Sequence, residues 1–166
     1  MFKIFRLISL LIFVMLPFTT NAHVQHYKDL KSIKFDIYRN GAHIGTHIFS
    51  FKKSEDELAI KSEIKFEIKK FSIVLYKYHA EGIEIYKDNK LIKFNSTTDQ
   101  NGKLKYTNIR ISNNNYIIDG SAYKGEVPLE FFIGTWWNHD IVEAPAQISA
   151  VSGRIIKQKV KFLAKE

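Results

Sequence analysis

ELAIKSEIKFEIKK, residues 57–70, alternates apolar and charged side chains along almost its whole length. On a strand, one face would carry Leu58, Ile60, Ile64, Phe66 and Ile68, and the other Lys61, Glu63, Lys65, Glu67 and Lys69. This period of two indicates a half-exposed β-strand, because a helix would need apolar positions three and four residues apart. An antiparallel sheet with one solvated face and one core face produces the pattern.

The same alternation recurs through most of the chain and is interrupted by short turn signals. Asn40-Gly41 supplies the positive φ angles of a tight hairpin, and "VSGR" at 151–154 predicts a last hairpin. We expect strands at 32–39, 43–52, 57–69, 73–87, 91–98, 103–111, 116–123, 146–151 and 154–163. Because most connections are short, sequential strands should pair. We therefore predict an all-β fold: a single antiparallel meander that forms a strongly curved sheet or an open barrel.

One segment, residues 127–145, breaks the strand rhythm. It contains "LEFFIGTWWNHDIVEA", which has too many consecutive apolar residues for a half-exposed strand. We expect a short helix or loop near 129–140 that plugs or covers the sheet. Both tryptophans of the chain lie there. We expect Trp137 to be buried against the sheet, with Trp136 and His139 facing a ligand or water.

The first 22 residues have the pattern of a secretory signal peptide. Lys3 and Arg6 precede the apolar run Leu7–Phe18, and "TTNA" gives a small-residue exit that ends at Ala22. The apolar run is too short for a membrane span, which needs about 20 residues. We predict cleavage near Ala22, export to the periplasm or the medium, and a single β domain over residues 23–166. No membrane span would remain.

Composition narrows the function classes. The chain has no cysteine, so disulfides and thiolate metal sites are excluded. The formal net charge is +8, but the lysines are scattered among glutamates and the predicted export removes the chain from cytoplasmic nucleic acid. We therefore predict no nucleic-acid binding, and leave weak attraction to anionic lipid as an open alternative.

Catalytic and metal-binding patterns are weak. The histidines His43 and His47 would lie about 13 Å apart on a strand, which is too far to chelate one ion. His139-Asp140 and His79-x-Glu81 offer acid–base pairs, but no Gly-x-Ser-x-Gly motif supplies a nucleophile. We predict no catalytic residue, no metal and no cofactor.

Aromatic residues give the best candidate for a site. Ligand pockets are mostly apolar with a few placed polar groups, and the "TWWNHD" segment supplies that mixture. The candidate ligand-binding residues are Trp136, Trp137, Asn138, His139, Tyr78 and His79. The favoured function is a non-catalytic binding module for a lipid or other apolar molecule. The alternatives are an envelope protein–protein interaction module and, third, a hydrolase-like enzyme. Plain core packing would explain the same residues.

Three motifs in order also resemble a known family. They are "FDIYRNGAHIGTHIFSF", "VLYKYHAEGIEIYKDNKLIKFNSTTDQNGK" and "GTWWNHDIV", followed by the "SGR" hairpin. Together they are similar to the exported bacterial proteins of domain-of-unknown-function family 6134, over about the whole of residues 23–166. The family pattern near the tryptophans resembles Ser-Tyr-Trp-Asn-Pro, so Trp137 and Asn138 match, Trp136 replaces the tyrosine and His139 replaces the proline. The resemblance implies an exported, mostly β domain and no established activity.

Overall fold

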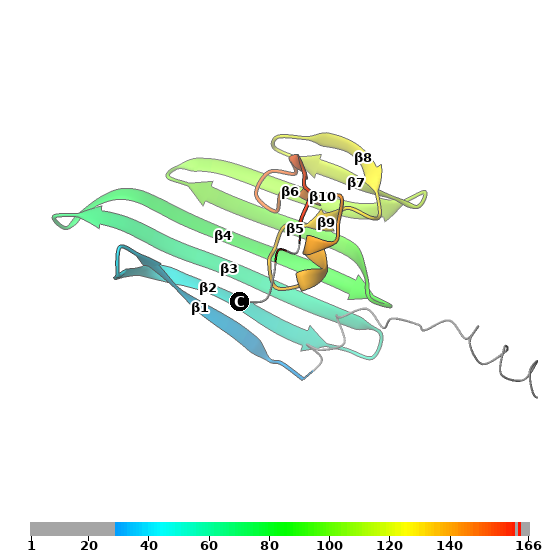
Figure 1. The fold of residues 1–166 in the computed structure, drawn as a ribbon, viewed down its shortest axis with the longest axis horizontal. Helices are drawn as coiled ribbons and strands as arrows, with labels where there is room; N and C mark the ends of the chain where they lie inside the picture. The colour runs from blue at the N-terminus through cyan, green and yellow to red at the C-terminus, as the bar shows by residue number, and fades with distance from the viewer. Residues whose placement is uncertain (1–28, 162, 164–166) are drawn as a thin grey trace, which may run out of the picture.

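Eight strands form one antiparallel sheet in chain order (Figure 1). The structure, a computed structural model, describes residues 29–161 and 163, so the predicted leader lies outside the described part of the chain. The strands are β1 (Ser32–Arg39), β2 (Ala42–Lys53), β3 (Glu57–Lys70), β4 (Ile73–Lys87), β5 (Lys90–Gln100), β6 (Lys103–Ser112), β7 (Asn115–Gly120) and β8 (Lys124–Pro128). The predicted antiparallel meander is confirmed. The sheet is not closed, because β1 and β8 are its two edges.

A second, smaller sheet follows β8. It contains β9 (Phe132–Ile133), β10 (Ala146–Ile148) and β11 (Ile155–Lys157), and the short 3-10 helix η2 (His139–Val142) lies between β9 and β10. We call residues 129–157 the C-terminal lobe. The lobe lies on one face of the large sheet, in front of β5 and β6 in Figure 1. No helix among the described residues is long and apolar enough to cross a membrane.

The end of the chain differs from the sequence expectation in two respects. The predicted strand 116–123 ends early, at Gly120, because the chain turns there, with the Gly120 N–H bonded to the Tyr123 carbonyl at 2.9 Å. It returns as β8, a strand that the sequence pattern did not predict. The two last predicted strands do form a hairpin, β10 and β11, but β10 pairs on its other side with β9 of the lobe and not with the meander. The short helix predicted near 129–140 corresponds to η2.

The lobe defines two faces of the large sheet. We call the face under the lobe the covered face and the opposite one the open face. Pairing aligns one covered-face residue from each of six neighbouring strands into a row: Phe51, Ile60, Glu84, Phe94, Ile109 and Ile118. Trp137, Ile133 and Ile148 of the lobe join this row in the hydrophobic core. The alternation of residues 57–70 thus places the apolar side chains on the covered face, where Leu58 and Ile60 join the core.

Glycine allows the lobe to approach the sheet closely. A Cβ atom on Gly120, at the end of β7, would lie 2.6 Å from the backbone oxygen of Ser152 and 2.9 Å from the Cα of Gly153. The Ser152 oxygen accepts a 2.8 Å hydrogen bond from the Ala122 N–H. Backbone therefore rests on backbone where the β10–β11 turn meets β7, and a side chain at position 120 would separate them.

Five two-residue turns in the meander have positive φ at both positions. Four of them consist of residues that tolerate this conformation, namely Asn40-Gly41, Asp88-Asn89, Asn101-Gly102 and Asn113-Asn114. The fifth, between β3 and β4, is Phe71-Ser72, with φ angles of 49° and 65°. The left-handed conformation costs an ordinary L-residue about 1–2 kcal/mol, so this turn is built against local preference.

Candidate functional site

Glu84 is a carboxylic acid in a row of apolar side chains. It lies on β4 opposite Ile60 of β3 and Phe94 of β5, and only 1% of its surface is exposed. A buried carboxyl group requires hydrogen-bond partners, because an unpaired charge in the core is strongly destabilising. Trp137 of the lobe supplies one partner, and Tyr86, two residues farther along β4, supplies another.

Two donors hold the Glu84 carboxyl group. The indole Nε1–H of Trp137 donates to Oε1 at 2.9 Å, and the Tyr86 hydroxyl donates to Oε2 at 2.7 Å. Burial raises the pKa of Glu84 from 4.5 to about 7, although hydrogen bonds from Tyr86, Trp137 and Thr135 favour the ionised form. The same burial raises the pKa of Tyr86 well above its ordinary value. The carboxyl group of Glu84 therefore exchanges a proton near neutral pH.

Trp137 lies between the lobe and the covered face, as the sequence predicted. It is 4% exposed, and its ring makes edge contacts with Tyr86 at 5.6 Å and Phe51 at 5.8 Å between ring centroids. Its neighbour Trp136 is 68% exposed and has a φ angle of 69°. This left-handed residue separates the two side chains. One ring enters the core and the other faces away from it.

Asn138 opens onto a cavity of about 370 Å³ between the sheet and the lobe. The residue is 4% exposed, and its side-chain oxygen caps η2 by accepting the Asp140 N–H at 3.0 Å. Its amide nitrogen Nδ2 is buried and has no hydrogen-bond partner among the described residues. Buried polar groups are nearly always paired, so a donor left without a partner beside a cavity is an unusual feature.

The lining of this cavity is mostly apolar. Aliphatic and aromatic side chains come from β4 to β7 and from the segment before β9, and the polar groups are few. The lining residues are Tyr86, Asn89, Lys90, Leu91, Ile111, Tyr116, Leu129, Glu130, Phe131, Phe132, Ile133, Asn138 and Asp140. The volume lies within the range of about 300–1,000 Å³ that is typical of small-molecule sites.

Trp136 and Tyr78 line a different and smaller cavity. It has a volume of about 160 Å³ and lies at the opposite side of the lobe, where Gly134 and Ala150 approach β4 and β5. The Tyr78 ring stacks on Phe66 of β3 at a centroid distance of 5.0 Å and an interplanar angle of 13°. Partial burial raises the pKa of Tyr78. The sequence therefore named an aromatic pair that the fold brings together, away from Asn138.

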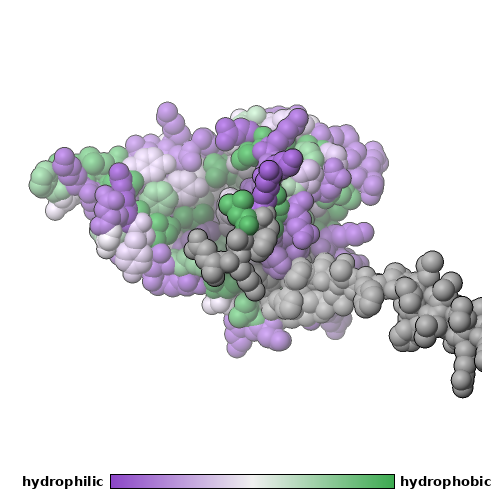
Figure 2. All heavy atoms as spheres, viewed as in Figure 1, coloured by the Kyte–Doolittle hydropathy of each residue, from purple (hydrophilic) through white to green (hydrophobic). Residues whose placement is uncertain are grey.

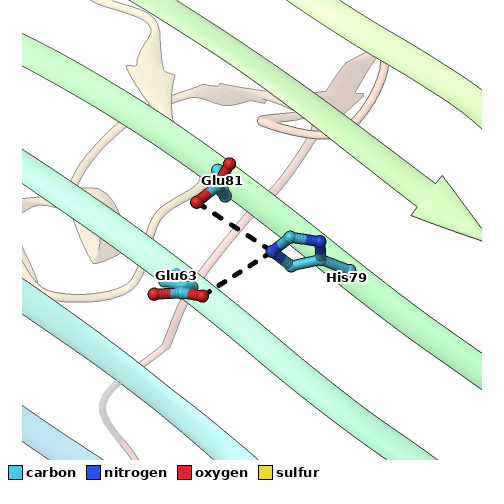
Figure 3. A group of neighbouring side chains, drawn as sticks. All are labelled: Glu63, His79 and Glu81. Carbon is cyan, nitrogen blue, oxygen red and sulfur yellow. Dashed lines mark ion pairs between the residues drawn. The ribbon is translucent and has the colours of Figure 1, made fainter.

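His79 lies on the open face, away from the four candidates at 136–139, although it lines a cavity of about 630 Å³ together with Tyr78. Its Nε2 atom is 3.7 Å from Glu63 Oε1 of β3 and 4.0 Å from Glu81 Oε1 of β4. Figure 3 shows both carboxylates turned toward the imidazole. The three ligand-type atoms of this group lie within 4.8 Å of one another. By residue type, one imidazole and two carboxylates are able to hold a divalent cation.

Lysines already neutralise this group. Lys65 forms an ion pair with Glu63, and Lys61 lies 3.7 Å from Glu81. The hydrogen bond from Lys65 is the main reason why the pKa of Glu63 lies below its ordinary value. A cation would have to displace both lysines, so the arrangement is better described as an ion-pair network on a solvated sheet face.

His139 and Asp140 form a pair at the start of η2. The His139 Nε2 atom is 3.8 Å from the Asp140 carboxylate, and half of the His139 side chain is exposed. The sequence allowed this pairing only if the segment was not extended, and the 3-10 helix meets that condition. No serine, threonine or histidine is among the described residues that line the 370 Å³ cavity.

The six candidate residues thus lie in separate parts of the molecule. The residue that connects the large sheet to the lobe was not among them. Glu84 receives the Trp137 hydrogen bond and was not a candidate. A signal was present in the sequence. Counting in twos along β4 from Tyr78 places Glu84 on the same face as Ala80 and Tyr86, so an acid stood at a core position.

The family model described as domain of unknown function (DUF6134) matches residues 35–166. The chain belongs to the DUF6134 family. This match confirms the resemblance and covers every element of the fold from within β1 onward. No curated protein and no solved structure matches the chain. The family carries no assigned activity, so any function has to be argued from the cavity and its residues.

Proposed function

We propose that this DUF6134 protein is a non-catalytic binding module for a lipid or other apolar molecule. The ligand would occupy the 370 Å³ cavity between the covered face and the lobe. The observation that carries the proposal is the mostly apolar lining of this cavity, to which Asn138 contributes a polar side chain whose buried Nδ2 atom has no partner among the described residues. A ligand oxygen would satisfy this donor, while Leu91, Ile111 and Leu129 would contact the apolar part.

The charges around the cavity favour a neutral head group. Asp140 and Glu130 contribute carboxyl groups to the lining, and Lys90 contributes the only basic one. A free fatty acid would place a third negative group beside Asp140, which Coulomb repulsion disfavours. An ester carbonyl accepts from Asn138 without that cost, and an alcohol in addition donates to Asp140. We therefore propose medium-chain alcohols and esters as the preferred ligand class.

We also propose that the module acts outside the cytoplasm. The support is the charged start, apolar run and small-residue exit of residues 1–22. Cell fractionation with the intact gene product tests this. A mature protein that begins near His23 in the periplasm or medium supports export, and an unprocessed cytoplasmic protein contradicts it.

Ligand binding is tested by native mass spectrometry and by displacement of the neutral fluorophore N-phenylnaphthylamine. Leu129→Trp fills the cavity and should abolish binding in a folded protein, whereas Leu104→Trp places the same ring on an exposed residue outside the cavity. Asn138→Asp keeps the oxygen that caps η2 but removes the donor, so it should weaken alcohol and ester binding. Equal binding by wild-type protein and Leu129→Trp, or no binding by the wild type, would refute the proposal.

A protein–protein module is the second candidate. The observation in its favour is the exposed indole of Trp136, which lies at the edge of the lobe beside the 160 Å³ cavity. Because Trp137 is buried in the core, the variant that tests this candidate is Trp136→Ala. A partner that copurifies with the wild type and is lost from the folded variant would favour it over the small-molecule function.

A further inference from the structure

The hairpin of β3 and β4 extends beyond its neighbours. Pairing with β2 stops at Phe66 and pairing with β5 stops at Tyr78, so residues 67–77 pair only with each other, apart from a hydrogen bond from the Asn101 N–H to the Lys77 carbonyl. In Figure 1 this hairpin reaches farther than any other at the left-hand end of the sheet. Its tip is therefore able to contact another surface before the rest of the meander does.

The tip is apolar and exposed. Phe71 is 89% exposed, and the next apolar side chains, Ile73, Val74 and Leu75, are also exposed. Figure 2 shows hydrophobic atoms at the same left-hand end, bordered by hydrophilic ones. Four exposed apolar residues among the five positions 71–75, at the end of a hairpin, are unlike the scattered single residues of an ordinary surface.

The turn sequence is not explained by folding. The other four two-residue turns of this type use only Asn, Asp and Gly, whereas this one holds Phe71 and Ser72 at positive φ. A phenylalanine in the left-handed conformation weakens the hairpin and gains no packing when its ring is in solvent. The ring would gain from burial only against something outside this protein.

Basic residues border the apolar tip. Lys69 and Lys70 precede the turn and Lys77 follows it, with Glu67 as the acid of the same segment. Lys69 and Lys77 both lie near Glu67, at 2.8 and 3.9 Å, so one carboxylate serves two lysines. The Lys70 ammonium lies 5.7 Å from the centre of the Phe71 ring. The three lysines outnumber the single glutamate, so the apolar tip is bordered by a net positive charge. Such a surface is complementary to a bilayer with anionic head groups.

We propose that the β3–β4 tip docks on an anionic phospholipid bilayer, with Phe71 and Ile73 entering the interface and the three lysines contacting lipid phosphates. This surface is separate from the 370 Å³ cavity, because none of its residues lines that cavity. The proposal is thus independent of the proposed ligand. Docking of the tip would hold the protein at a membrane by a few side chains, without a span.

Vesicle cosedimentation tests the proposal, using the chain from His23 onward because the apolar run of the leader would itself bind lipid. Vesicles of phosphatidylcholine with phosphatidylglycerol should bind the protein, and vesicles of phosphatidylcholine alone should bind it more weakly. Added salt should release it. The double substitution Phe71→Asn, Ser72→Gly restores a favourable turn and should lower the vesicle affinity at least about tenfold, without loss of folding.

Trp136→Asn is the matched control, since it also replaces an exposed aromatic residue at positive φ. It should bind vesicles like the wild type. The chain has no cysteine, so Ile73→Cys accepts a single environment-sensitive nitrobenzoxadiazole label, whose emission should shift to the blue on binding. The same label on Asp88→Cys, at the opposite end of β4, should not respond.

Three outcomes would overturn the proposal. They are no binding to phosphatidylglycerol vesicles, equal binding by the Phe71→Asn, Ser72→Gly variant, and binding without a response from the label at position 73. A change in oligomeric state of that variant by analytical ultracentrifugation, with vesicle binding unchanged, would instead assign the tip to contact with a second copy of the chain.

Discussion

The Trp137 indole donates a 2.9 Å hydrogen bond to Glu84, a residue 53 positions earlier in the chain. This bond joins the lobe to the middle of the meander at the point where the row of covered-face residues is interrupted by an acid. A hydrogen bond to a buried charged group contributes more to stability than one between neutral groups. The pair therefore connects the position of the lobe to the protonation state of one carboxyl group.

The raised pKa of Glu84 predicts that the free energy of unfolding falls as pH rises. Its folded pKa is about 7 and its ordinary value is 4.5, so between these values the folded state holds a proton that the unfolded state has lost. Stability should be highest below about pH 4.5 with respect to this group, fall through about pH 7 and then level off, by about 3 kcal/mol in total. Urea unfolding across this pH range measures it.

Glu84→Gln isolates that contribution. Glutamine resembles the protonated acid, so the variant should lack the decline and should exceed the wild type by up to about 3 kcal/mol at about pH 8. The comparison is needed because the lowered pKa of His47, caused by burial, acts in the opposite direction below its ordinary value of 6.5. Parallel pH profiles for the two proteins would show that Glu84 does not titrate in this window.

Trp137→Phe should destabilise the protein, and more so at high pH. The substitution removes the N–H that bonds Glu84 but keeps an aromatic ring, at an expected loss of about 1.5–3 kcal/mol. Because that bond favours the ionised carboxylate, the loss should be larger at about pH 8 than at about pH 5.

The adjacent tryptophan provides the control for that experiment. Trp136→Phe changes an exposed ring and should shift the free energy of unfolding by no more than about 0.5 kcal/mol. Equal effects of the two substitutions at both pH values would contradict the assignment of Trp137 as the residue that fixes the lobe.

Gly120→Ala should weaken the contact between the lobe and β7. The added methyl group would lie 2.6 Å from the Ser152 oxygen, a backbone atom that moves only with the β10–β11 turn. We expect a loss of about 1–3 kcal/mol, measured by urea unfolding, and a changed near-ultraviolet circular dichroism signal from Trp137. Gly134→Ala, whose nearest contact is the flexible end of Gln147 at 3.2 Å, should have the smaller effect.

Phe71→Asn, Ser72→Gly should raise stability. Both residues have positive φ, and the substitutions place at this turn the same pair that occupies 40–41 and 101–102. The expected gain is about 1–2 kcal/mol, from relief of the left-handed phenylalanine. An unchanged or lower unfolding midpoint would mean that the Phe71 ring makes a stabilising contact in the protein itself.

Strand positions were predictable because their signal is local. Residues 57–70 alternate so regularly that both the strand and its buried side follow from the side chains alone, and β1 to β6 lie close to their predicted ranges. The turns were equally readable, since Asn and Gly tolerate positive φ for reasons internal to each residue. Trp137 was predicted to be buried because it lies in the apolar break of the pattern, and it is.

The candidate site was predicted less well, because its contacts join distant parts of the chain. Glu63 meets His79 only through the register of β3 on β4, and Asn138 faces a cavity only after the lobe is placed. Tyr78 and His79 are adjacent in sequence, but Tyr78 lines the cavity beside Trp136 whereas His79 pairs with Glu63, and the only cavity that both residues line among the described residues lies beside β2 and contains none of residues 136–139.

The sequence by itself determined the all-β class, the order of the meander strands and the side of each strand that is buried. These depend on alternation and turn chemistry within a few residues. Only the tertiary structure decided that the last two strands leave the meander and that Glu84 accepts a hydrogen bond from Trp137. It also decided that a cavity remains beside Asn138. Each of these depends on how residues 129–157 pack against strands far earlier in the chain, as Trp137 does against Glu84, 53 positions before it, and packing at that distance is not encoded in any local pattern.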